Sequence, residues 1–327
     1  MRAVTVRAFG DLDAVAIEEH PDPVPAENEV LLEVRAAPVN YVDLVTMRGD
    51  YQFKPTLPYV PGKGPAGIVR QVGSAVHRSH PGDRVLAMAE YGGYAELATA
   101  EANQVHLLPA GLSFEDAATM SLAYDTAWMA LRERARLAAG ESVLVLGASG
   151  AVGRAAVSLA RAMGAATVLG SVSRPGREVG PADGVVDLSR QPLRDTIREQ
   201  VFALTDGRGV DVVIDPLGGD AFHGAIRALA WRGRLVVVGF AAGDIPQLKV
   251  NYTMLKNIEV SGLQISDYRK RVPELVRQCY AEVFEFYTEG RLDLQQAQTW
   301  PLAHWRDAVQ ALESRSATGR VVLSPQA

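Results

Sequence analysis

The chain contains one cysteine among its 327 residues, Cys279. A single cysteine can form neither an internal disulfide nor a cysteine-based metal cluster. Around Cys279, the residues Leu275, Val276, Tyr280 and Val283 recur at helical spacing, which favours a buried structural thiol over a reactive one. The sequence therefore excludes a disulfide-stabilised fold.

Long apolar runs, a signal peptide and a basic patch are also absent. The longest apolar runs, such as 143–147 and 235–240, have the length of a strand and are too short to span a membrane. Residues 1–10 lack the apolar core and cleavage site of a signal peptide. The net charge is −5, with acidic and basic residues mixed. We expect a cytoplasmic protein with neither a nucleic-acid nor a membrane partner.

The composition and residue pattern of the sequence change twice, which predicts two domains and a C-terminal segment that returns to the first. Residues 1–120 are rich in valine, proline and glycine and predict a β-rich domain. Residues 121–265 alternate short apolar runs with alanine-rich helices, a pattern typical of βαβ units and a parallel sheet. Residues 266–327 contain a helix over 273–289 and a final strand, and we expect them to return to the first domain.

A glycine-rich loop follows the first strand of the second domain. The apolar run 142–146 predicts a buried parallel strand, and a helix with one apolar face follows the loop. Its spacing is that of the dinucleotide fingerprint, with alanine at the first position. A glycine-rich turn without a ligand is the alternative. The predicted cofactor-binding residues of this loop are Ala148, Gly150, Ala151, Val152 and Gly153.

The next predicted strand, 166–172, bears on the identity of the nucleotide. A site for NAD places an acid at the end of this strand, whereas here no acid occurs before Glu178. Ser171, Ser173, Arg174 and Arg177 offer donors for the additional phosphate of NADPH. The missing acid favours NADPH, while arginines on a solvated loop, and thus NADH, remain the alternative.

Two further strands, 210–215 and 234–239, end in short loops. Ligands of a doubly wound sheet lie across the carboxyl ends of its strands. We therefore expect Pro216, Gly239 and Phe240 to border the cofactor, with a core position as the alternative for Phe240.

Several motifs together resemble one family over nearly the whole chain. They occupy residues 40–43, 57–67, 81–85, 92–96, 147–153 and 318–323. This order is similar to that of the quinone oxidoreductase, or zeta-crystallin-like, branch of the zinc-independent medium-chain dehydrogenases/reductases. The resemblance implies an α/β fold in which a Rossmann-type doubly wound parallel sheet accompanies a β-rich GroES-like barrel domain.

Zinc-dependent members of the superfamily have a cysteine at the position of Asn40 and a His-Glu pair close to Lys63 and Gly64. This chain lacks those ligands and the four structural cysteines, and its six histidines show no H-x-x-x-H spacing. We expect no metal site, which leaves direct hydride transfer to an electron-poor substrate.

The resemblance also implies roles at the reacting end. The candidate catalytic residues are Asn40, Asp43 and Tyr51. Asn40 would hydrogen-bond a carbonyl or a developing oxyanion, and Tyr51 would lie near the substrate. We expect Asp43 to fix the loop or helix start rather than to transfer a proton. Thr126 and Arg320 match residues that reach the cofactor. A turn asparagine, an N-cap aspartate and a packing tyrosine are the structural alternatives.

The sequence thus predicts an NADPH-dependent quinone oxidoreductase. An enone or enoyl reductase, which uses the same hydride donor, and a non-catalytic NADPH-binding protein are the alternatives. The strand-like run from Asn257 to Leu263 matches a segment through which members of this superfamily pair, so we expect a homodimer.

Overall fold

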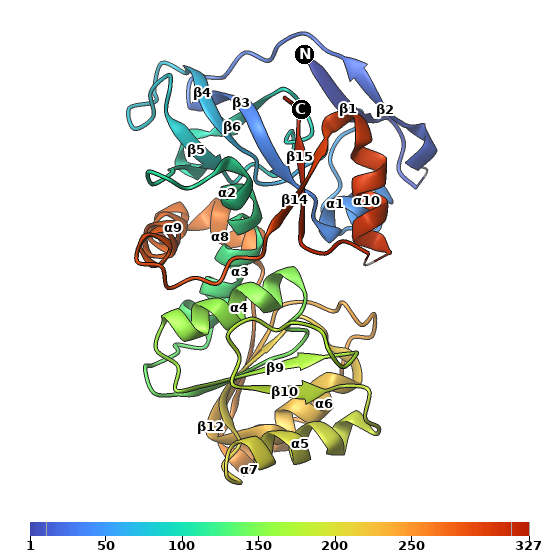
Figure 1. Ribbon diagram of the computed structural model, residues 1–327, viewed down its shortest axis with the longest axis vertical. Coiled ribbons are helices and arrows are strands. Elements are labelled where there is room, and N and C mark those ends of the chain that lie inside the picture. The colour runs from blue at the N-terminus through green and yellow to red at the C-terminus, as the bar shows by residue number, and fades with distance from the viewer. Residues whose placement is uncertain (11, 315, 327) are drawn as a thin grey trace. The chain divides into compact units, whose positions relative to one another are not determined.

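The computed structural model describes residues 1–10, 12–314 and 316–326. The chain forms two compact units (Figure 1). Unit 1 comprises Met1–Leu122, Arg269–Tyr280 and Gln295–Ala327, and unit 2 comprises Ala123–Tyr268 and Ala281–Leu294.

Unit 1 is built on a seven-stranded sheet in which β14, β15, β3, β4, β5 and β7 are neighbours in that order and β6 pairs with β3. All of its pairs are antiparallel except β14 with β15. This sheet-rich unit confirms the predicted GroES-like domain. Its strands are β3 (Glu29–Pro38), β4 (Ala66–Val72), β5 (Arg84–Ala87), β6 (Leu97–Glu101), β7 (Val105–Leu107), β14 (Ala297–Pro301) and β15 (Arg320–Ser324).

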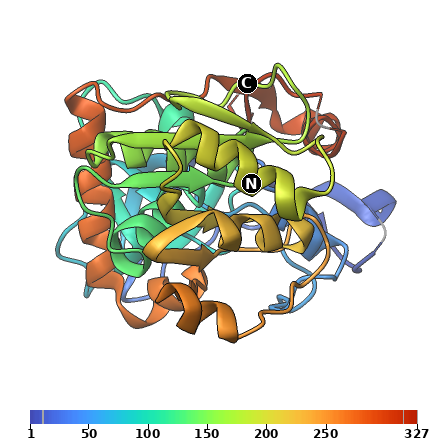
Figure 2. The same ribbon diagram turned by 90° about the horizontal axis from the view of Figure 1, so that it is seen from below.

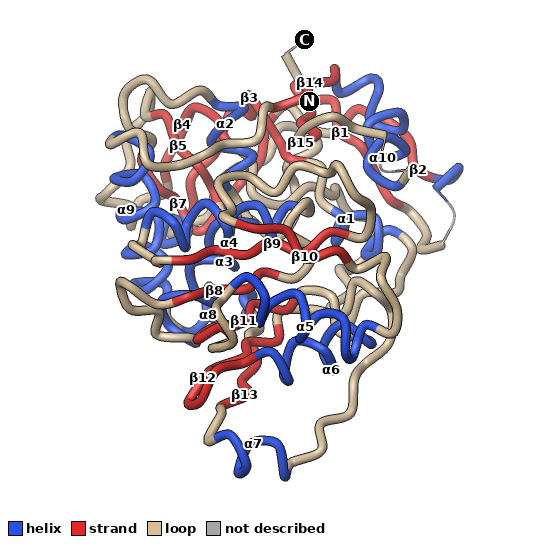
Figure 3. The backbone as a smooth tube through the Cα atoms, turned by 60° about the horizontal axis from the view of Figure 1, so that its bottom comes forward, coloured by secondary structure: helices blue, strands red, loops and turns tan. Residues whose placement is uncertain are grey.

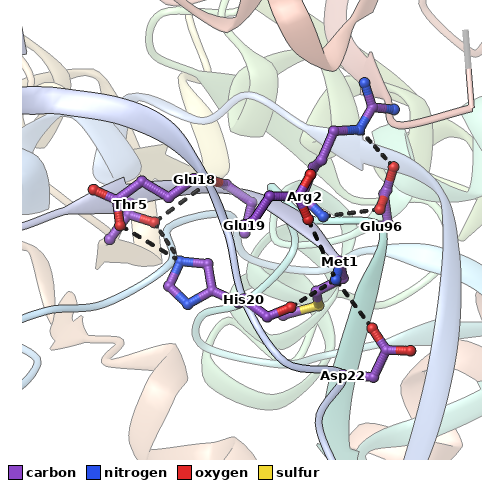
Figure 4. Close-up of polar contacts among 9 residues, drawn as sticks. Met1, Arg2, Thr5, Glu18, Glu19, His20, Asp22 and Glu96 are labelled. Atoms are coloured by element: carbon purple, nitrogen blue, oxygen red, sulfur yellow. Dashed lines mark hydrogen bonds and ion pairs between the residues drawn. The ribbon is translucent and has the colours of Figure 1, made fainter.

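An antiparallel pair, β1 (Arg2–Val6) with β2 (Val15–Glu19), completes unit 1. Polar contacts hold this pair in place (Figure 4). The Arg2 guanidinium donates to Glu96 at 2.8 Å, and the Thr5 hydroxyl lies 2.7 Å from His20 Nε2. Outside this pair, the Val6 N–H donates to the Tyr59 carbonyl at 2.9 Å, and this bond connects β1 to the segment between β3 and β4.

Unit 2 contains a six-stranded parallel sheet in the order β10-β9-β8-β11-β12-β13. The chain runs outward from β8 to one side and then returns to build the other side from β11, which makes the carboxyl ends of β8 and β11 the topological switch point. The strands are β8 (Ser142–Val145), β9 (Thr167–Val172), β10 (Gly184–Asp187), β11 (Val210–Asp215), β12 (Leu229–Val237) and β13 (Glu259–Gly262).

Helices cover both faces of this sheet, as Figures 1 and 3 show. The helices α3 (Ala123–Trp128) and α4 (Ala151–Ala162) lie on one face. The helices α5 (Leu193–Leu204) and α6 (Gly219–Ala228) pack together on the other, which Figure 2 brings to the front. The predicted Rossmann-type doubly wound sheet is therefore confirmed.

The remaining helices are α1 (Tyr41–Met47), α2 (Phe114–Met120), α7 (Asn251–Lys256), α8 (Ile265–Arg271), α9 (Pro273–Thr288) and α10 (Trp305–Glu313). A π-helical segment, Met129–Arg134, follows α3. The predicted strand from Asn257 is shorter than expected, because Asn257 ends α7 in the left-handed conformation (φ 54°) and β13 begins only at Glu259.

Candidate active site

The loop between β8 and α4 has the shape of a phosphate cradle. Gly150 caps the helix without a side chain, and the first N–H groups of α4 have no acceptor within the helix. A Cβ at Gly153 would lie 2.2 Å from the Gly147 carbonyl oxygen, so only glycine fits there. Ala148 and Gly153 are buried, Ala151 and Val152 are half-buried, and Gly150 is exposed. This geometry fits a dinucleotide pyrophosphate.

Ser171 lies in β9, but it hydrogen-bonds to the loop between β8 and α4 and not to the loop that follows β9. Its side chain is fully buried, and its hydroxyl accepts a hydrogen bond from the Gly147 N–H at 3.0 Å. Its carbonyl accepts from the Ala148 N–H at 2.9 Å. The register of β9 beside β8 produces these contacts. Of the predicted phosphate donors, Ser173, Arg174 and Arg177 lie exposed after β9.

Sequence reasoning missed Arg154, which lies in the first turn of α4. Its guanidinium is buried, lies 2.8 Å from Asp293 Oδ2 and reaches Glu178 Oε2 at 3.6 Å. Glu178 is the first acid after β9, and its carboxylate lies near Arg154 of α4. The signal available in the sequence was an arginine in the first turn of a helix that is small and apolar apart from Ser158 and Arg161.

At the end of β11, the buried Asp215 carboxylate accepts hydrogen bonds from the Leu217 and Gly218 N–H groups at 2.9 Å. Burial raises the pKa of this carboxyl, and the two backbone donors oppose the rise. The Pro216 carbonyl accepts from the Ala241 N–H at 3.1 Å, which joins the loops containing Pro216 and Gly239. Phe240 is 42% exposed, so it is not a core residue.

Thr126 is buried in α3, and its hydroxyl donates to Asp125 at 3.4 Å. Both residues belong to unit 2, together with the loop after β8. The predicted cofactor residues other than Arg320 thus all lie in this unit.

In unit 1, Asn40 and Asp43 form the start of α1. The Asn40 N–H donates to Asp43 Oδ2 at 3.0 Å, a capping-box contact in which the N3 side chain reaches back to the N-cap backbone. The Tyr94 hydroxyl donates to the same carboxylate oxygen at 3.2 Å. Asp43 therefore caps the start of α1.

Arg320 orients the side chain of Asn40. Its Nη2 donates to Asn40 Oδ1 at 3.1 Å, and both side chains are buried. A guanidinium can only donate, so the amide oxygen must face Arg320 and the amide N–H₂ group must face away from it. That N–H₂ group has a long contact, 3.4 Å, to the Pro38 carbonyl. The Asn40 side chain also hydrogen-bonds to Asp43, so one of these two contacts must be exchanged before the amide can donate to a further acceptor.

Burial raises the pKa of Asp43 to about 6, while the charge of Lys63 and the hydrogen bonds from Asn40 and Tyr94 oppose the rise. Burial also raises the pKa of Tyr94, and the neighbouring Asp43 carboxylate adds to this effect. The cluster around Asn40 is therefore largely dehydrated, and charges act strongly within it.

A second buried cluster, which sequence reasoning missed, centres on Lys63. Its ammonium is paired with Glu90, whose carboxylate also lies 3.2 Å from the Arg269 guanidinium. The ammonium faces the rings of Tyr91 and Tyr51, 4.8 and 5.6 Å from their centroids. Tyr51 is half-buried and contacts Phe53 edge-on. A lysine inside the otherwise small and apolar run 60–67 was the available signal.

Comparison with known proteins places the chain in a family. Residues 26–110 match the model of the alcohol dehydrogenase GroES-like domain, and residues 151–281 match that of the zinc-binding dehydrogenases. In the described ranges 1–10, 12–314 and 316–326, no group of three or more His, Cys, Asp or Glu side chains is arranged to hold a metal ion.

The relatives include quinone oxidoreductases, quinone oxidoreductase-like proteins and VAT-1 homologs. The chain is 34% identical over 303 residues to a quinone oxidoreductase-like protein 2 homolog of Nematostella vectensis, covering 91% of this chain and 82% of the relative. It is 31% identical over 345 residues to the human synaptic vesicle membrane protein VAT-1 homolog, covering 99% and 86%. The Escherichia coli quinone oxidoreductase complexed with NADPH superposes with a TM-score of 0.88 at 28% identity, covering 99% and 100%.

The chain therefore belongs to the quinone oxidoreductase branch of the zinc-independent medium-chain dehydrogenases/reductases, the family that the sequence resembles, and it is an oxidoreductase by family. Among the described helices, none has the length and apolar character needed to cross a membrane.

The raised pKa of Asp43 predicts a pH-dependent stability. A carboxyl with a pKa of about 6 in the folded state and 3.8 in the unfolded state binds its proton more tightly when folded. Its stabilising contribution is complete below the unfolded pKa and is lost as the pH rises through the folded pKa. The free energy of unfolding of the wild type, relative to Asp43→Asn, should fall by up to about 3 kcal/mol between pH 4 and 7.

Urea unfolding of both proteins across this pH range measures the difference, and the other titrating groups cancel in the comparison. A difference that rises with pH would show that Asp43 is instead held as a stabilised carboxylate.

Proposed function

We propose that the protein is an NADPH-dependent quinone oxidoreductase that transfers hydride without a metal ion. The observation that carries this proposal is the orientation of Asn40, whose amide oxygen is occupied by Arg320 and whose N–H₂ group faces away from Arg320, where a substrate oxygen would replace its long contact to the Pro38 carbonyl. Such a donor stabilises negative charge on a substrate oxygen, which is the requirement of hydride transfer to a conjugated carbonyl.

The nucleotide loop of unit 2 supports NADPH as the cofactor, as does the E. coli relative complexed with it. Ala148, Gly150, Ala151, Val152 and Gly153 would hold the pyrophosphate at the N-terminus of α4. Ser173, Arg174 and Arg177 would bind the additional phosphate, and Thr126, Pro216, Gly239 and Phe240 would border the remainder. When bound, NADPH supplies the hydride.

The residues of unit 1 would act on the substrate. Asn40 donates to the substrate oxygen, Asp43 keeps Asn40 at the start of α1, and Tyr51 contributes an aromatic side chain beside the substrate. Arg320 acts by orienting Asn40, a role that the contact at 3.1 Å favours over the cofactor contact implied by the family resemblance.

The wild type should oxidise NADPH in the presence of 9,10-phenanthrenequinone, faster than it oxidises NADH. Asn40→Ala removes the donor and should lower kcat by about 10²-fold. The exposed Asn28 in the same unit provides the matched control, and Asn28→Ala should behave as the wild type. The rate is followed as the loss of absorbance of the nicotinamide.

The same assay with 2-hexenal tests the alternative function. Turnover of the alkenal in place of the quinone would identify an enone reductase. Tight binding of NADPH without oxidation of either substrate would contradict both enzymatic functions and favour a non-catalytic NADPH-binding protein.

We also propose that the protein is a homodimer that pairs through β13. This strand lies at the edge of the parallel sheet, and an unpaired edge favours association. Exposed apolar residues lie on β12, on α7 and directly before α7, and these two elements pack together. Trp231 is 69% exposed, and Val250 and Met254 are each 72% exposed. Apolar side chains exposed beside a free strand edge are typical of a protein interface.

Light scattering at micromolar concentration should give twice the chain mass of 35.1 kDa. Val250→Glu should weaken the dimer, because it places a charge in the apolar surface. Val24, which is 80% exposed in unit 1, provides the control Val24→Glu, which should remain dimeric. A wild type that scatters as a single chain would contradict this proposal.

A further inference from the structure

Lys63 is a buried cation. It is 2% exposed, and its ammonium pairs with the carboxylate of Glu90. Removing a lysine from water costs several kcal/mol unless its charge is paired, and this pair compensates the cost only partly. A charge kept in such a position calls for a role beyond stability, because an apolar side chain of similar volume would pack there at a lower cost.

The surroundings hold this ammonium in one place. Glu90 is itself anchored by Arg269, a buried guanidinium 3.2 Å from the second carboxylate oxygen. The rings of Tyr91 and Tyr51 face the ammonium at 4.8 and 5.6 Å, distances at which the negative faces of the rings attract a cation. The charge is therefore preorganised and does not have to move when a neighbouring group becomes negative.

The field of Lys63 reaches the site at Asn40. Its charge lowers the pKa of Asp43 against the effect of burial, and Asp43 accepts the hydrogen bond from the Asn40 N–H at 3.0 Å. Tyr51, the aromatic residue proposed to lie beside the substrate, is also one of the two rings that face the ammonium. Lys63 and Asn40 thus belong to one polar neighbourhood of unit 1.

We propose that Lys63 is the fixed positive charge that stabilises the oxyanion formed on a substrate bound at Asn40. This inference rests on the proposed function. The substrate carbon accepts the hydride with its two electrons, the displaced π pair moves to the conjugated oxygen, and water later supplies the proton to that anion. Lys63 acts through its electrostatic field and through its contact with Tyr51, so it is a positioning residue. It favours substrates in which the negative charge is localised on one oxygen.

The test compares variants of the full-length protein. Lys63→Met removes the charge, and the double variant K63M/E90Q also removes the carboxylate that would otherwise lose one of its two cationic partners. Both should lower kcat by about 10²-fold while KM and the affinity for NADPH change by less than about twofold. Lys63→Arg restores a cation and should recover about tenfold of the loss.

Lys54 provides the matched control. Its ammonium also lies over an aromatic ring of unit 1, 5.8 Å from the centroid of Phe9, but Lys54 is exposed and lies outside the buried cluster. Lys54→Met should keep the wild-type kcat. Wild-type kcat in K63M, or a loss in K63M that Lys63→Arg does not reduce, would overturn the inference while leaving the proposed function intact.

A second measurement does not depend on turnover. Because Lys63 lowers the pKa of Asp43, Lys63→Met should move the titration of Asp43 upward from about 6, as read from NMR of the labelled carboxyl. An unchanged titration would overturn the inference even if kcat falls. Failure of the proposed function would give a different result: the wild type itself would oxidise NADPH with neither 9,10-phenanthrenequinone nor 2-hexenal.

Discussion

A hydrogen bond between Arg320 and Asn40 joins residues 280 positions apart and orients the side chain on which the proposed function depends. It requires β15, the last strand, to pair with β3, which ends at Pro38 just before Asn40. It also determines which group of the Asn40 amide, the oxygen or the N–H₂, faces away from Arg320. Since the guanidinium accepts no hydrogen bond, the group that faces away is a donor. A site that presents a donor is suited to an oxygen that gains negative charge, and the proposed chemistry follows from this single constraint.

Buried charge is the second feature on which the site depends. Asp43, Lys63, Glu90, Arg269 and Arg320 all belong to unit 1, and all but the partly exposed Glu90 are buried. In water these charges would be screened, whereas in a dehydrated cluster each one acts on its neighbours. The raised pKa of Asp43 reports this environment. Under the proposed function, these fixed side-chain charges would supply the stabilisation that a Lewis-acidic metal supplies in metal-dependent enzymes.

The sequence predicted those parts of the structure that depend on neighbouring residues. Steric demands within seven residues define the loop from Gly147 to Gly153, and the capping role of Asp43 depends on a spacing of three residues. The ends of β8 and β9 differ from the predicted strands by no more than a residue, because a buried parallel strand is a continuous apolar run.

The remaining features depend on contacts between distant segments. Ser171 was expected at the phosphate, but strand register buries its hydroxyl against Gly147. Lys63 meets Glu90 across 27 positions, and Arg269 meets Glu90 across 179. Arg320 was expected at the cofactor because of the family resemblance, and only the three-dimensional structure places it on Asn40. No local sequence pattern predicts such pairings.

Under the proposed function, protein side chains support hydride transfer without a metal ion. The most direct test is the rate of NADPH oxidation with 9,10-phenanthrenequinone before and after exhaustive dialysis against a strong chelator, with metal content measured in both samples. The rate should be the same in both samples and should not change when zinc is added back. A rate that disappears with the metal and returns with zinc would contradict this proposal.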